Sequence, residues 1–330
     1  MKVLLTGGAG FIGANLAHYW VTHYPDDELV VFDALTYAGH RESIAELDHH
    51  PKFRFIRGNI GDRAAVGAAL EGVDLILHLA AESHNDRAIQ HPLRFLETNV
   101  LGTGVLLEEA RRRDIGRFHH VSTDEVFGML SLDSPDRFNE ESPYRPRGPY
   151  PASKAGADHL VRAWGETYGL RFTISNCGNN LGPYQFPEKL IPHSIVRLLQ
   201  GQRLQLYGDG RHVRDWIFVQ DHCEAIDLIS HRGTVGSTYV VSAESELSNR
   251  DVAGRLVRLF GQDDHAIEFI ADRPGHDRRY ALDPRRLREE LGWRPRQDFD
   301  TALRLTVDWY RSHTSWWQPL VDAGQAGERS

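Results

Sequence analysis

Short apolar runs alternate with segments of helical periodicity through the first half of the chain. The apolar runs, each predicted to be a β-strand, lie at residues 3–6, 29–33, 53–56, 75–79 and 118–122. Apolar residues at helical spacing lie between them, at residues 11–19, 64–70 and 98–112. Strands that alternate with helices favour right-handed crossovers and a parallel sheet. We therefore predict an α/β fold with a doubly wound parallel sheet.

The regular alternation weakens after about residue 175, where several prolines interrupt the pattern. The remaining predicted elements are helices at 191–199, 221–230, 249–260 and 284–291, and a strand at 238–241 that returns to the main sheet. A polar tail follows Asp322. We predict two interlocked units. Residues 1–175 with about 219–242 form the sheet domain, and residues 176–218 with 243–330 form a smaller α/β lobe.

Composition narrows the possible partners. Hydrophobic residues make up 41% of the chain and charged residues 25%, as in an ordinary globular protein. The formal net charge of -8 argues against nucleic acid or an anionic membrane as partner. No apolar run approaches the roughly 20 residues of a membrane span, and no signal-peptide core follows Met1. Two cysteines are too few for a disulfide framework or a zinc site, so we expect a cytoplasmic protein without a metal.

Three glycines stand between the first predicted strand and the first helix. Gly7, Gly10 and Gly13 have the spacing G-x-x-G-x-x-G, which permits a tight turn and a close approach of a pyrophosphate to the helix N-terminus. Asp33 ends the second strand, where a carboxylate accepts hydrogen bonds from ribose hydroxyls and repels a 2′-phosphate. A glycine-rich turn is the alternative interpretation. Because strand, motif, helix and acid occur in register, we predict a Rossmann-type domain that binds NAD, with Asn59 near the adenine.

Tyr150 and Lys154 form a Y-x-x-x-K pair after the fifth predicted strand, on one face of the helix that follows. Lysine occurs only at positions 2, 52, 154 and 189 of this arginine-rich chain. An unperturbed tyrosine, with a pKa of about 10, is a poor base. A nearby ammonium and a positive nicotinamide ring both favour the phenolate. A surface helix pair is the alternative, but the position in a dinucleotide fold favours catalysis.

Two consecutive acids end the fifth predicted strand. Asp124 and Glu125 follow Thr123 at the carboxyl edge of the sheet, where ligands bind in open α/β folds. Hydride transfer alone requires neither acid. The pair suits an elimination, in which one group removes a carbon-bound proton and the other protonates the departing hydroxyl. The alternative is an acidic helix N-cap.

These residues resemble the extended short-chain dehydrogenase/reductase group and, within it, the dTDP-glucose 4,6-dehydratases. The resemblance runs from position 7 to about 311, and its most specific stretches are residues 179–192 and 273–277. It implies a hydro-lyase of deoxysugar biosynthesis that acts on dTDP-glucose. In that cycle Tyr150 deprotonates O4 as NAD oxidises C4, Glu125 removes the C5 proton, and Asp124 protonates the C6 hydroxyl. Hydride then returns to C6, leaving a 4-keto-6-deoxy sugar.

The resemblance also assigns binding roles. The catalytic set is Thr123, Asp124, Glu125, Tyr150 and Lys154. The residues expected to hold NAD are Gly7, Gly10, Phe11, Ile12, Gly13, Asp33, Leu35, Thr36, Asn59, Ile60, Leu79, Ala80, Ala81, Ser83, Thr98, Tyr150, Lys154 and Asn180. The residues expected to touch the sugar nucleotide are Ser83, Thr123, Asn179, Glu188, Lys189, Leu190, Leu206, Tyr207, Arg214, Asn249, Arg273 and His276.

Four positions differ from the family's usual pattern. Phe127 and Leu181 replace a more common tyrosine, Asn85 replaces valine, and Asn59 replaces aspartate. We expect these differences to affect affinity and to lie outside the catalytic set.

Several alternatives stay open on the sequence. Another NDP-hexose 4,6-dehydratase, an NDP-sugar 4-epimerase, a nucleotide-uronate decarboxylase and a non-catalytic NAD-sensing regulator share parts of the pattern. The epimerase would not need Asp124 and Glu125, and a regulator should have lost part of the catalytic set. The motifs do not distinguish thymine from uracil. As in relatives, we expect a homodimer through the helices at 98–112 and 151–168.

Overall fold

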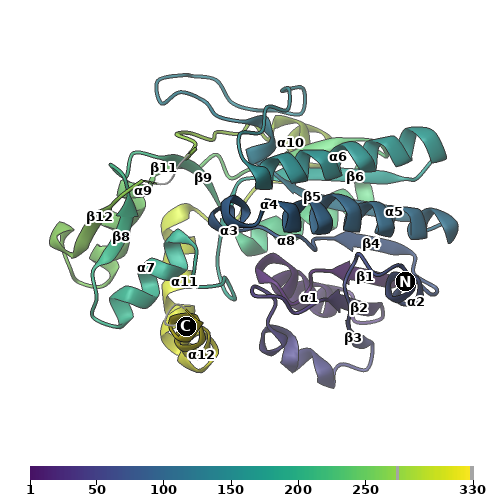
Figure 1. Cartoon of the computed structure of the whole chain (residues 1–330), viewed down its shortest axis with the longest axis horizontal. Helices are drawn as coiled ribbons and strands as arrows, with labels where there is room; N and C mark the ends of the chain where they lie inside the picture. The colour runs from purple at the N-terminus through teal and green to yellow at the C-terminus, as the bar shows by residue number, and fades with distance from the viewer. Residues whose placement is uncertain (273–274, 328–330) are drawn as a thin grey trace.

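Seven parallel strands form the central sheet of the computed structural model, which describes residues 1–272 and 275–327 (Figure 1). The strands are β1 (Lys2–Thr6), β2 (Glu28–Asp33), β3 (Phe53–Arg57), β4 (Leu75–His78), β5 (Arg117–Thr123), β6 (Phe172–Cys177) and β10 (Thr238–Val241). Their order is β3-β2-β1-β4-β5-β6-β10, and every neighbouring pair is parallel. The Rossmann-type prediction is confirmed, including the return of residues 238–241 to the sheet.

The strand order reverses direction beside β1, which is flanked by β2 and β4. Thr6 at the end of β1 is in register with Phe32 of β2 and His78 of β4. The carboxyl ends of these strands therefore lie level. In open α/β sheets this switch point is where ligands bind.

Helices cover both faces of the sheet because successive strand residues point to opposite sides. Leu4 packs in a cluster with α2 (Arg63–Ala69), α5 (Thr103–Arg112) and α6 (Pro149–Tyr168). Its neighbours Val3 and Leu5 pack in a second cluster on the other face. That cluster includes residues of α1 (Phe11–His23), η1 (Arg41–His49) and α8 (Val219–Arg232). Both faces are apolar, as a buried parallel sheet requires.

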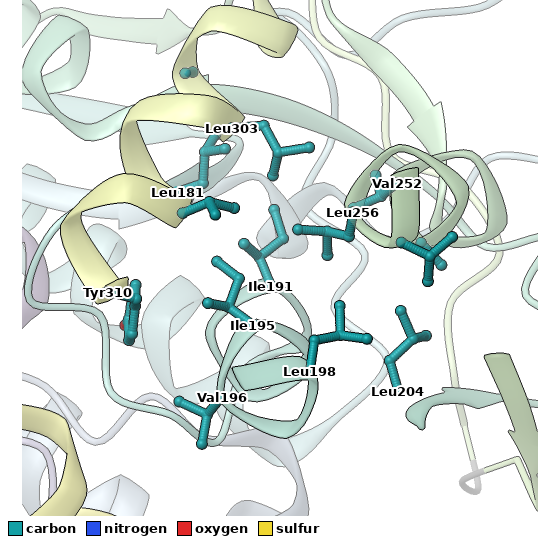
Figure 2. Close-up of a cluster of buried hydrophobic side chains, with 14 of the residues drawn as sticks. Leu181, Ile191, Ile195, Val196, Leu198, Leu204, Val252, Leu256, Leu303 and Tyr310 are labelled. Atoms are coloured by element: carbon teal, nitrogen blue, oxygen red, sulfur yellow. The ribbon is translucent and has the colours of Figure 1, made fainter. Parts of the chain in front are cut away.

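A separate hydrophobic core lies beyond the sheet. Its helices are α7 (Leu190–Leu199), α9 (Asn249–Leu259), α11 (Phe299–Ser312) and α12 (Thr314–Gly327). Its short strands are β7 (Asn179–Leu181), β8 (Leu204–Tyr207), β9 (Val213–Phe218), β11 (Glu246–Ser248) and β12 (Ile267–Ile270). Figure 2 shows Ile191, Ile195, Leu256 and Leu303 converging from α7, α9 and α11. This core agrees with a second lobe, whose boundaries stay a prediction.

The segment 98–112 is not the uniform helix that its pattern predicted. A π-helix, η2 (Leu96–Gly102), precedes α5, and two short helices, α3 (Asn85–Gln90) and α4 (Pro92–Phe95), lead into it. π-Helical turns are rare and occur often at functional sites. The polar end of the chain also continues as helix, since α12 extends to Gly327. Among the described residues, no helix has the length and apolar character needed to cross a membrane.

Candidate active site

The glycine loop packs directly against the backbone at the end of β4. Gly7 has a φ of 72°, and a Cβ there would lie 2.6 Å from the amide nitrogen of Ala80. A Cβ on Gly13 would lie 2.1 Å from the carbonyl oxygen of Gly7. Gly10 precedes α1 without a side-chain cap, so the first amides of α1 keep their hydrogen-bonding capacity for a ligand. The loop therefore fits a pyrophosphate at the N-terminus of α1, where Phe11 and Ile12 begin the helix.

Asp33 ties this loop to the end of β2. Its carboxylate accepts hydrogen bonds from the backbone nitrogens of Ala9 (3.0 Å) and Leu35 (2.8 Å). Burial raises the pKa of Asp33, and the two backbone hydrogen bonds oppose that rise. Leu35 adopts a positive φ of 53°, and Thr36 beside it is exposed. A carboxylate held at this position is compatible with the predicted contact to the ribose of NAD.

The segment after β3 gives weaker support to a ligand contact. Asn59 is exposed, and its amide oxygen accepts a hydrogen bond from the backbone nitrogen of Gly61 (2.8 Å). The predicted hydrogen bond to adenine would therefore use an oxygen that already accepts one hydrogen bond. Ile60 is buried in the core between the sheet and α5.

Asn99 holds the loop that follows β4. Its side-chain oxygen accepts from the backbone nitrogen of Glu82 (2.8 Å), and its amide donates to the Glu82 carbonyl (2.9 Å) and the Ser153 hydroxyl (2.8 Å). These bonds fix the loop of residues 79–83 relative to α6. All residues of this loop except Glu82 were predicted to hold NAD or substrate. Asn99 lies in the π-helix η2, next to Thr98. The sequence contained Asn99 only as part of a matching stretch, without a role.

Tyr150 and Lys154 lie in the first two turns of α6, which begins at Pro149. The Lys154 ammonium is buried and donates to the carbonyl of Val121 in β5 (2.9 Å). Burial lowers the pKa of Lys154, and the negative charge of Asp158 opposes this. Burial also raises the pKa of Tyr150 well above its ordinary value, with the charge of Glu125 as the next cause, while Thr123 opposes the rise. The phenol therefore needs a further positive charge beside it before it can act as a base.

Thr123, at the end of β5, caps the short helix η3 (Asp124–Phe127). Its hydroxyl oxygen accepts from the backbone nitrogen of Glu125 (3.3 Å), and its hydroxyl donates to the carboxyl of Asp124 (3.2 Å). Since Thr123 supplies the cap, the interpretation of the two acids as an N-cap is wrong.

Asp124 and Glu125 have different surroundings. Asp124 is only 2% exposed, and its Oδ2 atom has no hydrogen-bond partner among the described residues. Burial raises the pKa of Asp124 well above its ordinary value, and the charge of Glu125 adds to this, while Arg214 opposes it. Glu125 is half-buried and accepts hydrogen bonds from the side-chain amide of Asn85 (3.1 and 3.4 Å). Two neighbouring acids in such unlike environments can serve as one proton donor and one base.

Asn85 therefore corrects one expectation. The sequence placed its departure from valine outside the catalytic set, but its side chain contacts Glu125 directly. The other departures lie where they were expected or in the core. Phe127 is buried against Phe138 and Tyr144, and Leu181 is fully buried in the second core.

The segment after β7 reaches the loop after β4. Lys189 donates to the carbonyl of Ser83 (3.0 Å), and the Glu188 carboxylate lies 3.7 Å from both His84 and Arg87. Burial raises the pKa of Glu188, and Lys189 and Arg87 oppose the rise. The predicted sugar-contacting pair is thus brought to the switch-point edge of the sheet.

Two asparagines of β7 were also predicted to bind ligands. Asn180 is buried, and its side-chain oxygen pairs with the ring of His222 (3.0 Å). Asn179 precedes it and is half-buried. Leu190 begins α7 and packs partly against the second core.

Arg214 of β9 is positioned by backbone oxygens. Its guanidinium donates to the carbonyls of Val213 (2.8 Å) and Asp277 (2.9 Å) and lies over the ring of Tyr280. The neighbouring Asp215 accepts a hydrogen bond from the hydroxyl of Ser242 (2.6 Å). The positive charge of Arg214 opposes the rise in the pKa of Asp124.

The structure supports some of the other predicted nucleotide contacts and not others. Asn249 begins α9, is buried, and has a side-chain oxygen without a partner among the described residues. Tyr207 is partly exposed, whereas Leu206 is fully buried in the second core and presents no open surface. A side-chain contact from Leu206 to a ligand is therefore not supported. Arg273 lies outside the described residues.

His276 packs against a second histidine. Its ring stacks on His212 at 3.7 Å, and its Nδ1 atom lies 2.7 Å from Asp272. These three residues have ligand atoms within 4.8 Å of one another. The Arg278 guanidinium lies 3.5 Å from His212, which disfavours a cation there. The prediction of no metal stays a prediction.

A family model described as GDP-mannose 4,6 dehydratase matches residues 4–306 of the chain. The chain belongs to this family. It is 51% identical to a dTDP-glucose 4,6-dehydratase of Mycobacterium tuberculosis, over 99% of this chain and 98% of the relative. Its fold matches DesIV, a dTDP-glucose 4,6-dehydratase of Streptomyces venezuelae solved with NAD and dTDP bound. The match has a TM-score of 0.94 and 47% identity and covers 97% of this chain and 100% of DesIV.

A related enzyme class shares the fold at lower identity. A UDP-glucose 4-epimerase of Thermus thermophilus, in complex with NAD, matches with a TM-score of 0.86 and 30% identity. That match covers 95% of this chain and 100% of the epimerase.

Proposed function

We propose that this chain is an NAD-dependent dTDP-glucose 4,6-dehydratase, a hydro-lyase that forms dTDP-4-keto-6-deoxyglucose and water. The observation that carries the proposal is the pair at the end of β5. Burial raises the pKa of Asp124 and so favours its protonated form, while Glu125 beside it accepts hydrogen bonds from Asn85. The 51% identical relative and DesIV, both dTDP-glucose 4,6-dehydratases, support the same substrate.

NAD fits the glycine loop and Asp33, and DesIV was solved with it. Bound there, NAD supplies reversible oxidation at C4 and reduction at C6 of the sugar. The loop would give backbone amides to the pyrophosphate, and Asp33 would accept hydrogen bonds from the ribose. Tyr150 and Lys154 complete the nicotinamide side, with Lys154 fixed on β5 by the Val121 carbonyl.

The protein's side chains then move protons. Tyr150 takes the proton of the sugar O4, and Thr123 at the same edge donates to the oxygen. The resulting 4-ketone acidifies the C5–H bond. Glu125 takes the C5 proton, the C–H electrons form the C5–C6 double bond, and Asp124 gives its proton to the C6 hydroxyl, which leaves as water. Once hydride has returned to C6, C5 takes up a proton from Glu125 and C4 remains a ketone. Tyr150 then releases its proton and Asp124 regains one through solvent, which restores the starting protonation state.

The nucleotide half would bind beside the second core. Arg214 of β9 donates to the carbonyl of Asp277, the residue after His276. His276 stacks on His212, whose carbonyl accepts from the backbone nitrogen of Asn249. An arginine whose guanidinium is already oriented by carbonyls gives charge-assisted hydrogen bonds to a diphosphate at little entropic cost. Lys189 contacts Ser83 and Glu188 lies near His84, in the loop that also carries Asn85, the partner of Glu125, so the two residues suit the hexose hydroxyls.

Mass spectrometry of dTDP-glucose after incubation with the purified protein tests the reaction class. A dehydratase removes one water without added cofactor, because NAD is regenerated in each turnover. A 4-epimerase leaves the mass unchanged, a decarboxylase releases carbon dioxide from a uronate, and a regulator changes nothing. Incubation with UDP-glucose and GDP-mannose in parallel distinguishes the nucleotide. An unchanged mass for dTDP-glucose would reject the proposal.

We also propose a homodimer formed through η2, α5 and α6. Leu101 of η2 and Tyr168 at the end of α6 are 65% and 53% exposed, which is unusual for large apolar side chains. Analytical ultracentrifugation of the protein and of Leu101→Glu tests this. A dimer that the substitution converts to monomer supports the interface. A cytoplasmic location remains our expectation, in keeping with two free, buried cysteines, Cys177 and Cys223.

A further inference from the structure

Glu125 is a carboxylate with few stabilising contacts. Its charge acts on three neighbouring acidic groups and raises the pKa of each: Asp124, Tyr150 and Tyr280. No salt bridge joins it to a cation within residues 1–272 and 275–327. The described hydrogen bonds to its carboxylate come from one side chain, the amide of Asn85.

Asn85 reaches Glu125 from the first residue of α3. The amide nitrogen lies 3.1 Å from Oε2 and 3.4 Å from Oε1 of Glu125. The same amide therefore engages both oxygens of the Glu125 carboxylate. An amide N–H bonded to an ionised oxygen is stronger than one bonded to a neutral oxygen. The contact therefore fixes the direction of the Glu125 side chain.

The same short helix also contacts Tyr150. Ala88, one turn after Asn85, forms a small apolar cluster with Phe95 and Tyr150, in which the Phe95 and Tyr150 rings meet edge to face at 6.3 Å. Residues three apart lie on one face of a helix. One face of α3 thus touches the tyrosine that acts at O4 and the carboxylate that acts at C5.

We propose that Asn85 is a positioning residue that orients Glu125 for removal of the C5 proton. This rests on the proposed dehydratase function and deepens it. Asn85 touches neither the substrate's reacting atoms nor the cofactor in this account. It acts through Glu125, so its loss should slow elimination and leave the first oxidation at C4 intact.

The test compares Asn85→Leu, which keeps the shape and removes the donor, with wild type in single-turnover and steady-state assays. We expect kcat to fall about tenfold with KM within about twofold, which is the pattern of a lost transition-state interaction. Transient NADH absorbance should rise, and the kinetic isotope effect with C5-deuterated dTDP-glucose should increase, because elimination becomes rate-limiting. Gln90→Leu, an exposed position on the same helix, is the matched control and should behave as wild type.

A second variant separates positioning from structural support. Asn85→Asp presents a carboxylate to Glu125 at neutral pH but a protonated donor at lower pH, so its activity relative to wild type should recover as pH falls. The ratio for Asn85→Leu should not depend on pH.

Three results would overturn the inference. They are a wild-type kcat and isotope effect in Asn85→Leu, an equal loss of NADH formation and elimination, and a pH-independent ratio for Asn85→Asp. Failure of the wild-type protein to remove water from dTDP-glucose would instead reject the proposed function.

Discussion

Replacing Asp33 by Asn tests how the NAD site is built. Its carboxylate accepts two backbone N–H groups, from Ala9 at 3.0 Å and Leu35 at 2.8 Å, in a site only 8% exposed. The amide of Asn keeps one acceptor oxygen and turns an NH2 group toward the other N–H. One hydrogen bond to a charged group is lost, worth about 1.5–3 kcal/mol, and one N–H is left unpaired, at about 1–3 kcal/mol.

After partial relaxation we expect the free energy of unfolding of the NAD-free protein to fall by about 2–4 kcal/mol. The ribose also loses an ionised acceptor, so NAD affinity should fall about tenfold to a hundredfold. Urea denaturation of stripped protein measures the first quantity, and the NAD content per purified chain together with titration measures the second. Asp26→Asn, at an exposed turn, is the control. Unchanged unfolding energy and NAD content in Asp33→Asn would refute this reasoning about the loop.

Three further predictions concern acid chemistry and packing. Burial raises the pKa of Asp124, so the folded chain keeps a proton that the unfolded chain loses above about pH 4, and stability falls as pH rises toward the folded pKa. The Tm of Asp124→Asn should therefore rise relative to that of wild type as pH increases, and equal pH slopes of Tm would contradict this. The kcat of the variant should fall about a hundredfold to ten-thousandfold. Tyr150→Phe should keep its contact with Phe95 but form no NADH in a single turnover, and normal transient absorbance would count against its role. Ile195→Ala, fully buried in the second core (Figure 2), should cost about 2–5 kcal/mol in urea denaturation, whereas exposed Leu305→Ala should cost little.

The strands at the switch point could be predicted because each is an uninterrupted apolar run, as both-face burial requires. β6 (Phe172–Cys177) was missed for a physical reason. Its Thr173 and Ser175 are fully buried, yet they read as polar in the sequence. The ring of His119 on β5 pairs with both hydroxyls, at 3.0 and 3.1 Å. These hydrogen bonds offset the cost of burying the hydroxyls, and they form only in the tertiary structure.

Motif and spacing singled out the candidate catalytic residues at the end of β5 and the start of α6, but their electrostatics could not be predicted from the sequence. The neighbouring residues in the sequence do not show that Asp124 and Glu125 have different environments. The difference arises because Asp124 is buried and Glu125 contacts Asn85. The π-helix that places Asn99 is likewise stabilised by partners distant in sequence, Glu82 and Ser153. Such contacts appear only when the sheet has brought the loops together.

The pairing of an acid and a base at the end of β5 is tested most directly by Glu125→Gln in a single turnover. The variant should retain bound NAD, since the glycine loop and Asp33 are untouched. With dTDP-glucose it should accumulate NADH and the 4-ketone, and the sugar should keep its water by mass spectrometry. Loss of water at the wild-type rate from this variant would contradict the account.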